Sequence, residues 1–398
     1  MTARPDRPLR IWLIAGEESG DQLGAKLMGA LKATLGPASI VFEGVGGDAM
    51  AAQGMRTLFP LSDIAVMGIG AVVARLPSLV QRVYRTVDAI VQGRPDAVVI
   101  IDSPEFTHAV ARRVRRRLPS LPIVNYVSPS VWAWRPGRAR KMRAYVDHVL
   151  ALKPFEPEAH RRLGGPPCTY VGHPLIERFD ELRPKPGERP CVDQDPINLL
   201  VLPGSRRSEI GRLMEPFGAT LSVLAKHLDR PVRPIVPAVS HLADEIEERS
   251  RDWPVAPKIV RGEAAKYAAF RSAHAALAAS GTVSLELALS GVPMVVAYKV
   301  SRLEEQIKYL LTVPSIVLAN LILGENVIPE RIQRDCTPEK LTDALLPLFR
   351  DSPERRRQLD AFARLDELMS IGDEAPSMRA ARLVLDVARG TPTVKAVT

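Results

Sequence analysis

The chain has 398 residues, of which 46% are hydrophobic and 25% charged, values that are typical of a globular protein with two domains. Its three cysteines lie far apart in the sequence, so neither a disulfide framework nor a zinc site is expected. The formal net charge of +9 predicts an anionic partner, either nucleic acid, a phosphorylated small molecule or an acidic membrane face.

The N-terminal region predicts a strand over 9–15 that follows a short basic segment directly. No run in the chain approaches the about 18 consecutive apolar residues of a membrane span, so we expect synthesis in the cytosol without a signal peptide. The strand leads into G-E-E-S-G-D, whose glycine spacing is not that of a dinucleotide site. Its polar groups suit the hydroxyls of a sugar acceptor, with Glu17, Ser19 and Asp21 as candidates, although Asp21 also suits a helix cap.

The stretch I-A-V-M-G-I-G-A-V-V-A over 64–74 carries no charge. It is too short to cross a bilayer and too rich in glycine for a firm helix prediction. Two interpretations stay open. One is packing in the core, and the other is an apolar surface for acyl chains or membrane contact that contains Val66, Met67 and Ile69.

A buried strand predicted over 96–101 delivers Asp102, in D-S-P-E-F, to the carboxyl edge of a parallel sheet. Open parallel sheets place catalytic groups at this edge, and the proline ends the strand. Asp102 is therefore a candidate general base. The alternative is that it caps the next helix.

Ten Lys or Arg residues and no acid lie between Glu105 and Asp147. Arginine interleaved with tryptophan suits an anionic phospholipid surface, and the expected contacts are Trp132, Trp134 and Arg138. Single-stranded nucleic acid is an alternative partner, and core packing is an alternative role for the tryptophans. His173 is a lone histidine before a proline, which favours a packed hinge residue over a base.

A proline-rich segment over 183–196 predicts a linker. It separates an N-terminal domain over 1–182 from a C-terminal domain over 197–373, and a helix over 374–390 has the option of packing back on the first domain. The D-Q-D within the linker follows no strand, which favours solvated charge over a metal site. We expect no metal.

The second half repeats the alternation of strands and helices. Gly204, Ser205 and Arg206 follow a strand predicted over 197–202. The glycine permits a close backbone approach, and a guanidinium binds phosphate with two hydrogen bonds.

A second phosphate site is predicted at Ser280, Gly281 and Thr282, which form a tight turn between a buried strand and a helix. The unpaired N–H groups and the dipole of that helix attract an anion, although an ordinary turn of an α/β sheet has the same pattern. Glu286 lies one turn inside the helix, where its carboxylate can reach a ribose diol.

Two α/β halves joined by a linker form a cleft between their loop edges, the usual place for a ligand. The phosphate-directed groups of one half and the carboxylates of the other predict transfer from a nucleotide-diphosphate donor to an acceptor. A carboxylate would act as base, and the helix dipole and arginine would neutralise the departing diphosphate without a metal.

Eight motifs, in order from about residue 11 to 338, together resemble the lipid A disaccharide synthase family: G-E-E-S-G-D, V-G-G-D-A-M, D-S-P-E-F, Y-V-S-P-S-V-W-A-W, Y-V-G-H-P-L, L-P-G-S-R, A-S-G-T-V-S-L-E and L-A-N-L-I-L-G-E. The resemblance implies a GT-B fold, with two Rossmann-like domains facing across a cleft, and an inverting transfer that needs no cofactor. The donor would be UDP-2,3-diacylglucosamine and the acceptor 2,3-diacylglucosamine 1-phosphate, giving a β-1,6-linked disaccharide 1-phosphate and UDP.

The resemblance also implies a localisation, at the inner face of the inner membrane of Gram-negative bacteria. The partners would be the two lipid substrates and an anionic membrane surface, with no nucleic acid and with a homodimer left open. Motif by motif, the family's base falls on Asp102 and its donor-binding residues on Arg206, Glu286, Asn320 and Gln333.

Two positions depart from the family pattern. Glu18 stands where the family more often has alanine, and Glu105 is longer than the expected aspartate. Two rival functions remain: a UDP-sugar 2-epimerase of GT-B type, and a non-catalytic protein that binds an anionic membrane or RNA.

Overall fold

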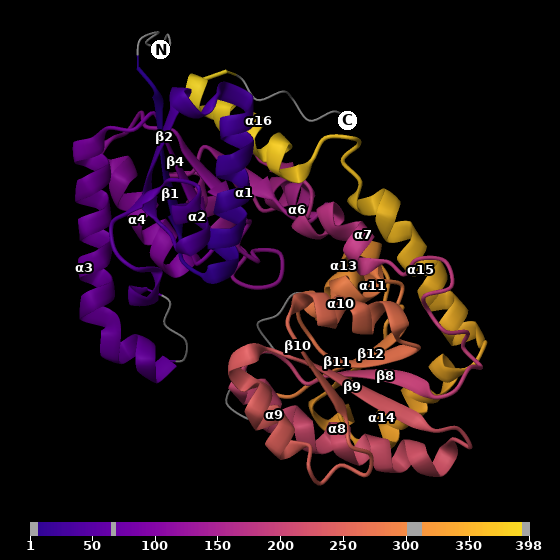
Figure 1. The fold of residues 1–398 in the computed structure, drawn as a ribbon. Helices are drawn as coiled ribbons and strands as arrows, with labels where there is room; N and C mark the ends of the chain where they lie inside the picture. Colours follow the sequence, from indigo (N-terminus) through magenta and orange to yellow (C-terminus); the bar gives the residue numbers. More distant parts are fainter. Residues whose placement is uncertain (1–6, 65–68, 301–312, 392–398) are drawn as a thin grey trace. The chain divides into compact units, whose positions relative to one another are not determined.

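The computed structural model describes residues 7–64, 69–300 and 313–391, and of residues 69–75 only the backbone. The chain divides into two compact units (Figure 1). Unit 1 comprises Met1–Glu177 and Ile371–Thr398, and unit 2 comprises Arg178–Ser370. The first segment of unit 1 and the whole of unit 2 end a few residues before the proposed limits of 182 and 373, whereas unit 2 begins well before the proposed start at 197.

Unit 1 is a sheet of parallel strands with helices on both faces. Its strands are β1 (Leu9–Ala15), β2 (Ile40–Val45), β3 (Arg56–Thr57), β4 (Ala97–Ile101), β5 (Ile123–Tyr126), β6 (His148–Ala151) and β7 (Cys168–Tyr170). Its helices are α1 (Glu18–Leu35), α2 (Asp48–Ala52), α3 (Ile69–Gly93), α4 (Pro104–Arg117), α5 (Gly137–Met142), α6 (Glu156–Arg162) and α16 (Pro376–Arg389).

The core of unit 1 lies on both sides of its sheet. Alternate residues of β1 point to opposite faces, so Leu13 packs with α1 and α16 while Trp12 and Ile14 pack with α3 and α4 (Figure 1). Helix α16, distant in sequence, contributes Ala380 and Val384 to the first of these clusters. The helix expected over 374–390 therefore completes the core of unit 1.

Unit 2 has the same architecture. Its strands are β8 (Ile197–Leu202), β9 (Val232–Ala238), β10 (Lys258–Arg261), β11 (Ala275–Ala279), β12 (Met294–Tyr298) and β13 (Glu330–Ile332). Its helices include α7 (Phe179–Leu182), α8 (Arg207–His227), α9 (Ala243–Arg249), α10 (Glu263–Ser272), α11 (Thr282–Leu289), α13 (Leu318–Leu323), α14 (Pro338–Leu345) and α15 (Pro353–Met369).

The segment expected as a linker over 183–196 lies within unit 2. The guanidinium of Arg189 donates hydrogen bonds to the carbonyl oxygens of Phe270, Ser290 and Gly291, at the ends of α10 and α11. This segment is therefore fastened to unit 2 along part of its length.

Each sheet has one point at which the strand order reverses. In unit 1 the order is β3-β2-β1-β4-β5-β6-β7, so the reversal lies between β1 and β4. In unit 2 the order is β10-β9-β8-β11-β12-β13, and the reversal lies between β8 and β11. Open α/β sheets bind ligands at the carboxyl ends of the strands that flank such a point.

No described helix combines the length and the hydrophobicity that crossing a membrane requires.

Buried histidines make unit 1 sensitive to acid. Burial lowers the pKa of His108 and of His148 to about 4, and burial together with Lys153 lowers the pKa of His173 to about 3. A histidine of the unfolded chain has a pKa of about 6.5, so the unfolded state binds more protons below that pH and stability is lost as the pH falls. We expect the free energy of unfolding to decrease by about 2 kcal/mol per histidine between pH 7 and pH 5.

Urea unfolding of the whole chain at several pH values checks this expectation. The His108→Gln variant should show a smaller decrease in stability than the unsubstituted chain, whereas His227→Gln, at an exposed position on α8, should show the full decrease. Equal pH dependence in all three proteins would contradict it.

Candidate active site

The strand reversal of unit 1 brings the loop after β1 beside the loop after β4, because Ala15 pairs with Ile101 in the parallel sheet. The close approach depends on Gly16, since a Cβ atom at this position would lie only 2.1 Å from the Cβ atom of Ser103. The glycine of G-E-E-S-G-D thus allows the two loops to touch.

Asp102 occupies the first position after β4 and has a positive φ of 52°, as does Ser103 with 43°. Aspartate tolerates this left-handed region better than most residues, and such conformations gather at functional sites. The Oδ1 atom of Asp102 accepts a hydrogen bond of 2.7 Å from the backbone N–H of Ser103. Its Oδ2 atom lies 3.5 Å from the hydroxyl of Ser19, so this oxygen is weakly engaged within the described part of the chain.

The three acceptor candidates of the first loop have different surroundings. Glu17 and Ser19 are exposed, and the Ser19 hydroxyl faces Asp102. Asp21 is 3% exposed, and its carboxylate accepts hydrogen bonds from the backbone N–H groups of Gly47, Ala49 and Met50. Both of its oxygens therefore cap the N-terminus of α2, which agrees with the alternative capping role, and acceptor binding by Asp21 stays a prediction.

The strand reversal of unit 2 places the G-S-R loop beside the S-G-T turn, because β8 and β11 are neighbours and Leu202 pairs with Ala278. A buried carboxylate, that of Glu209, organises the first loop: its Oε2 atom accepts hydrogen bonds of 3.0 and 3.2 Å from the N–H groups of Ser205 and Arg206. The guanidinium of Arg206 contacts Oε1 of Glu209 at 3.3 Å and remains 62% exposed. The backbone of Arg206 is thus held by Glu209, while its guanidinium stays accessible to a ligand.

Gly204 is required by this arrangement. Its φ is 112°, a value that other residues rarely adopt, and a Cβ atom would lie 2.3 Å from Oε2 of Glu209. We expect Gly204→Ala to lower the stability of unit 2 by about 1–3 kcal/mol and to weaken UDP binding. Chemical denaturation and calorimetric titration with UDP measure the two effects.

The matched control is Gly211→Ala, since Gly211 lies on the exposed side of α8 with open space around its would-be Cβ atom. Alanine is the better helix former, so this variant should gain about 0.5–1 kcal/mol. A Gly204→Ala protein that keeps both stability and UDP affinity would show that the loop does not need glycine.

The S-G-T turn opens α11 after β11. The Ser280 hydroxyl donates to the carbonyl oxygen of Ile316, which fixes the turn, and Gly281 and Thr282 are exposed at the start of the helix. Glu286 is 13% exposed, and both of its carboxylate oxygens accept hydrogen bonds from the Lys266 ammonium, at 3.2 and 3.0 Å. Any ribose contact by Glu286 is therefore shared with Lys266 of α10.

Comparison with known proteins gives the family. Residues 11–381 match the family model described as lipid-A-disaccharide synthetase. The chain is 59% identical over 382 residues to the lipid-A-disaccharide synthase of Rhodopseudomonas palustris (strain HaA2), an alignment that covers 96% of each chain. It is 56% identical over 389 residues to that of Nitrobacter winogradskyi, covering 98% of this chain and 97% of the relative.

The chain belongs to the lipid-A-disaccharide synthase family. Solved structures share its fold at low sequence identity. A glycotransferase of kitacinnamycin aligns with a TM-score of 0.63 at 16% identity, covering 96% of this chain and all (100%) of that one. The UDP-GlcNAc 2-epimerase of Neisseria meningitidis aligns with a TM-score of 0.60 at 12% identity, covering 95% and 100%. The two Rossmann-like units are those of a GT-B fold.

Two residues that only the resemblance to the lipid-A-disaccharide synthase family assigned to UDP are engaged elsewhere. Asn320 is 1% exposed; its amide oxygen accepts from the N–H groups of Val327 and Ile328, and its amide nitrogen donates to the carbonyl oxygen of Ile328 and the carboxylate of Glu330. Every hydrogen-bonding site of this side chain is filled by the fold. Asn320 therefore holds the segment between α13 and β13, and its binding of UDP stays a prediction.

Gln333 has a similar structural role. Its amide oxygen accepts a hydrogen bond of 2.7 Å from the N–H of Val300, and its amide nitrogen donates to the carbonyl oxygen of the same residue. The side chain thus pairs with the backbone that follows β12. These two hydrogen bonds fix the loop, and they leave one amide N–H and one oxygen lone pair of Gln333, so its binding of UDP stays a prediction.

The membrane-contact candidates are spread over unit 1. Val66 and Met67 lie outside the described residues, and Ile69 is the first residue of α3. The indole N–H of Trp132 donates to the buried carboxylate of Glu156. Trp132 is therefore tied to the interior of unit 1.

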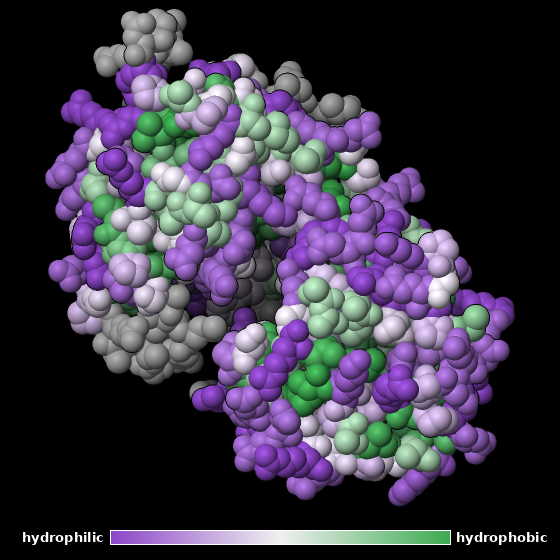
Figure 2. All heavy atoms as spheres, viewed as in Figure 1, coloured by the Kyte–Doolittle hydropathy of each residue, from purple (hydrophilic) through white to green (hydrophobic). Residues whose placement is uncertain are grey.

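The other two candidates, Trp134 and Arg138, are partly exposed and have partners. The guanidinium of Arg135 stacks on the ring of Trp134 at 4.1 Å from its centre. Arg138 is paired with Glu105 at 2.8 Å. On α3, by contrast, Leu76, Val80 and Tyr84 are 53%, 44% and 52% exposed at four-residue spacing, and the surface over this helix mixes hydrophobic and hydrophilic atoms in Figure 2.

Two residues of the site, Glu209 and Lys266, were not predicted from the sequence. Glu209 had a local signal, since an acid three residues after a helix N-cap commonly bonds the cap's backbone N–H. Lys266 had none, because its contact with Glu286 depends on how α10 packs beside α11. Both residues set the charge that the candidate donor site presents.

Proposed function

We propose that this protein condenses UDP-2,3-diacylglucosamine with 2,3-diacylglucosamine 1-phosphate to give the β-1,6-linked disaccharide 1-phosphate and UDP. The observation that carries the proposal is the 59% identity to a lipid-A-disaccharide synthase over 96% of the chain. The two strand reversals support it, because each presents groups of the chemistry that one substrate requires.

Acceptor activation is assigned to unit 1. The Oδ2 atom of Asp102 takes the proton from the 6-hydroxyl of the acceptor sugar, while the N–H of Ser103 holds Oδ1 and thereby orients the carboxylate. The hydroxyl oxygen then attacks the anomeric carbon of the donor from the side opposite the diphosphate. The bond from that carbon to the diphosphate oxygen breaks, and the configuration is inverted.

Donor binding is assigned to unit 2. The exposed guanidinium of Arg206 and the first turn of α11, at Gly281 and Thr282, offer positive charge to the departing diphosphate. Groups fixed in advance stabilise developing charge effectively, since they need no reorganisation during the reaction. Ser280 and Glu209 supply this rigidity by binding backbone groups of the two loops.

The proposed localisation follows from the substrates. Both carry acyl chains, so we assign the enzyme to the cytoplasmic side of the inner membrane as a peripheral protein. The exposed apolar side chains of α3 and the cationic surface of unit 1 support contact with an anionic membrane. A homodimer is compatible with this proposal.

An assay of UDP release with purified protein tests the function. We expect release only when UDP-diacylglucosamine and the 1-phosphate acceptor are both present, together with a new disaccharide in the lipid fraction. Conversion of the UDP-sugar without acceptor would favour the epimerase instead. Absence of any turnover, with binding to anionic vesicles retained, would favour the non-catalytic membrane-binding protein.

A further inference from the structure

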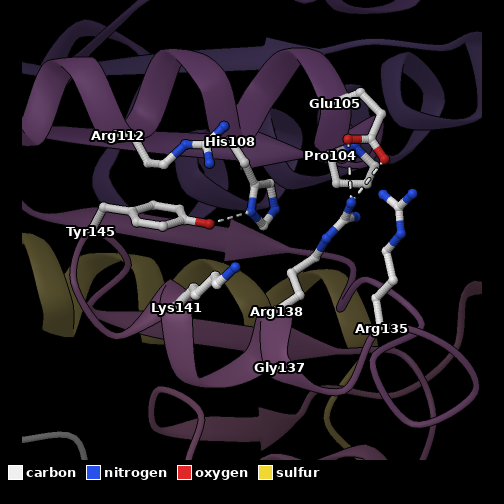
Figure 3. A pocket seen from close by; sticks show the side chains of 9 residues that line it. All are labelled: Pro104, Glu105, His108, Arg112, Arg135, Gly137, Arg138, Lys141 and Tyr145. Carbon is white, nitrogen blue, oxygen red and sulfur yellow. Dashed lines mark hydrogen bonds and ion pairs between the residues drawn. The ribbon is translucent and has the colours of Figure 1, made fainter.

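Unit 1 contains a basic pocket whose residues have no role in the proton transfer or the diphosphate departure described above. It is a depression of about 500 Å³ between the first turns of α4 and the segment that runs through α5 to residue 145. Four cationic side chains line it and are seen around the opening in Figure 3, namely Arg112, Arg135, Arg138 and Lys141.

The charges of this pocket are not balanced by the protein. Glu105 is the acidic residue of its lining, and both of its oxygens accept hydrogen bonds from Arg138, at 2.8 and 3.2 Å. Within the described residues, neither Arg112, Arg135 nor Lys141 forms an ion pair. Three positive charges therefore remain for a ligand after Arg138 and Glu105 neutralise each other.

Aromatic rings, not carboxylates, support two of these cations. The guanidinium of Arg112 lies over the ring of Tyr145, 5.8 Å from its centre, and that of Arg135 lies over Trp134. A stacked guanidinium presents its flat face to the ring and keeps its N–H edge available. This arrangement suits two-point binding of phosphate oxygens.

The inner wall of the pocket is neutral and fixed in orientation. The amide nitrogen of Asn125 donates to the carbonyl of Val127, so its oxygen faces Nε2 of His108 at 2.9 Å and accepts a hydrogen bond from its N–H. Nδ1 of His108 then accepts from the hydroxyl of Tyr145 at 3.1 Å. The imidazole is neutral near pH 7, because burial and the charge of Arg138 lower its pKa to about 4.

We propose that this pocket binds a phosphate monoester, and specifically the 1-phosphate of the acceptor sugar. The identity of the acceptor rests on the proposed function, whereas the preference for a phosphate monoester rests on the pocket. Three uncompensated cations match a group with a charge of about −2. The 14-residue helix α4 also directs its positive end toward the pocket through Pro104 and Glu105.

The position of the pocket agrees with the chemistry assigned to Asp102. Pro104 lines the pocket and follows Asp102 by two residues, so their Cα atoms are at most about 7.6 Å apart. One hexose ring spans a distance of this order, so the Pro104 edge of the pocket is within reach of a sugar held at Asp102. The acceptor can therefore present its 6-hydroxyl to Asp102 while its phosphate occupies the pocket.

Steady-state kinetics in detergent micelles test this inference with the double variant Arg112→Gln/Lys141→Gln. Each cation lost should weaken a charge-assisted phosphate contact, so we expect the KM for the acceptor to rise by about tenfold per substitution, with the KM for the UDP-sugar unchanged. The control is Arg116→Gln/Arg140→Gln, which removes the same charge from exposed positions of the same two helices outside the pocket lining. It should keep the original KM.

A direct binding measurement separates this inference from the proposed function. Calorimetric titration with glucosamine 1-phosphate should show binding to the unsubstituted chain and to the control, and about 100-fold weaker binding to the pocket variant. If the unsubstituted protein shows no acceptor-dependent turnover but this pattern of binding holds, the proposed function fails and the phosphate pocket stands. If turnover is normal and the pocket variant keeps both KM and binding, the pocket inference is overturned.

Vesicle flotation distinguishes the acceptor phosphate from a phospholipid headgroup. If the pocket binds the phosphate of the acceptor, the pocket variant and the control should bind vesicles containing anionic phosphatidylglycerol equally. If only the pocket variant fails to bind these vesicles while its KM for the acceptor in micelles is unchanged, the pocket binds a lipid headgroup and the inference is wrong.

Discussion

Asp102→Asn should reduce acceptor-dependent UDP release by about 10²–10⁴-fold, which is the usual contribution of a positioned general base. The amide cannot take the proton of the acceptor hydroxyl. Asparagine is the informative substitution because it tolerates the left-handed backbone that Asp102 adopts and can still accept the hydrogen bond from Ser103. The measurement is kcat at saturating concentrations of both substrates.

The same protein should keep its folded stability and its affinity for UDP, since the residues assigned to UDP belong to unit 2. Asp88→Asn is the matched control: Asp88 is exposed, and its partner is Arg117 at the surface of unit 1. That variant should retain turnover within about twofold, in keeping with the small value of exposed ion pairs. Normal turnover by Asp102→Asn would move the base to another residue, with Glu17 as the first to examine.

Arg206→Gln should lower kcat by about 10²-fold, the effect of removing one fixed group that stabilises developing negative charge. The loop itself should persist, because Glu209 holds it through the backbone N–H groups of Ser205 and Arg206 and not only through the guanidinium. The loss should therefore appear in the chemical step as well as in UDP binding. Single-turnover kinetics with saturating enzyme separate the two.

Arg207→Gln provides the control for this variant. Arg207 is the next residue in the chain, is 76% exposed and is paired with Glu245 of α9. Its substitution changes the net charge equally but should leave kcat near its original value. Equal losses in the two variants would mean that general surface charge, and not the position of Arg206, supports the reaction.

The sequence predicted the buried strands best. The expected strands over 9–15 and 197–202 agree with β1 and β8 at both ends. Strands that are covered on both faces appear as continuous apolar runs with sharp limits, which a sequence shows directly. The starts of helices are harder to predict: α8 begins at Arg207, and its first turn is built from polar residues that resemble those of a loop.

The candidate site could be predicted as far as its loops. Asp102, the G-S-R loop and the S-G-T turn were expected at the carboxyl ends of strands, and the structure places each of them beside a strand reversal. The partners of side chains could not be predicted in this way. Asp21 and Asn320 appear in the sequence as polar residues of the predicted site loops, yet each is buried and binds backbone groups, Asp21 those of α2 and Asn320 those of the loop that follows its own helix.

The return of α16 to unit 1 has a consequence for how the protein is made. The cluster that α16 completes also contains residues of β1 and α1, which leave the ribosome first. All of unit 2 is synthesised between these partners, so unit 1 keeps part of its hydrophobic face uncovered during that time while unit 2 can already fold. The nascent chain thus passes through a stage in which the half that emerges first is the last to be finished, and this stage is the one in which chaperones have an apolar surface to bind.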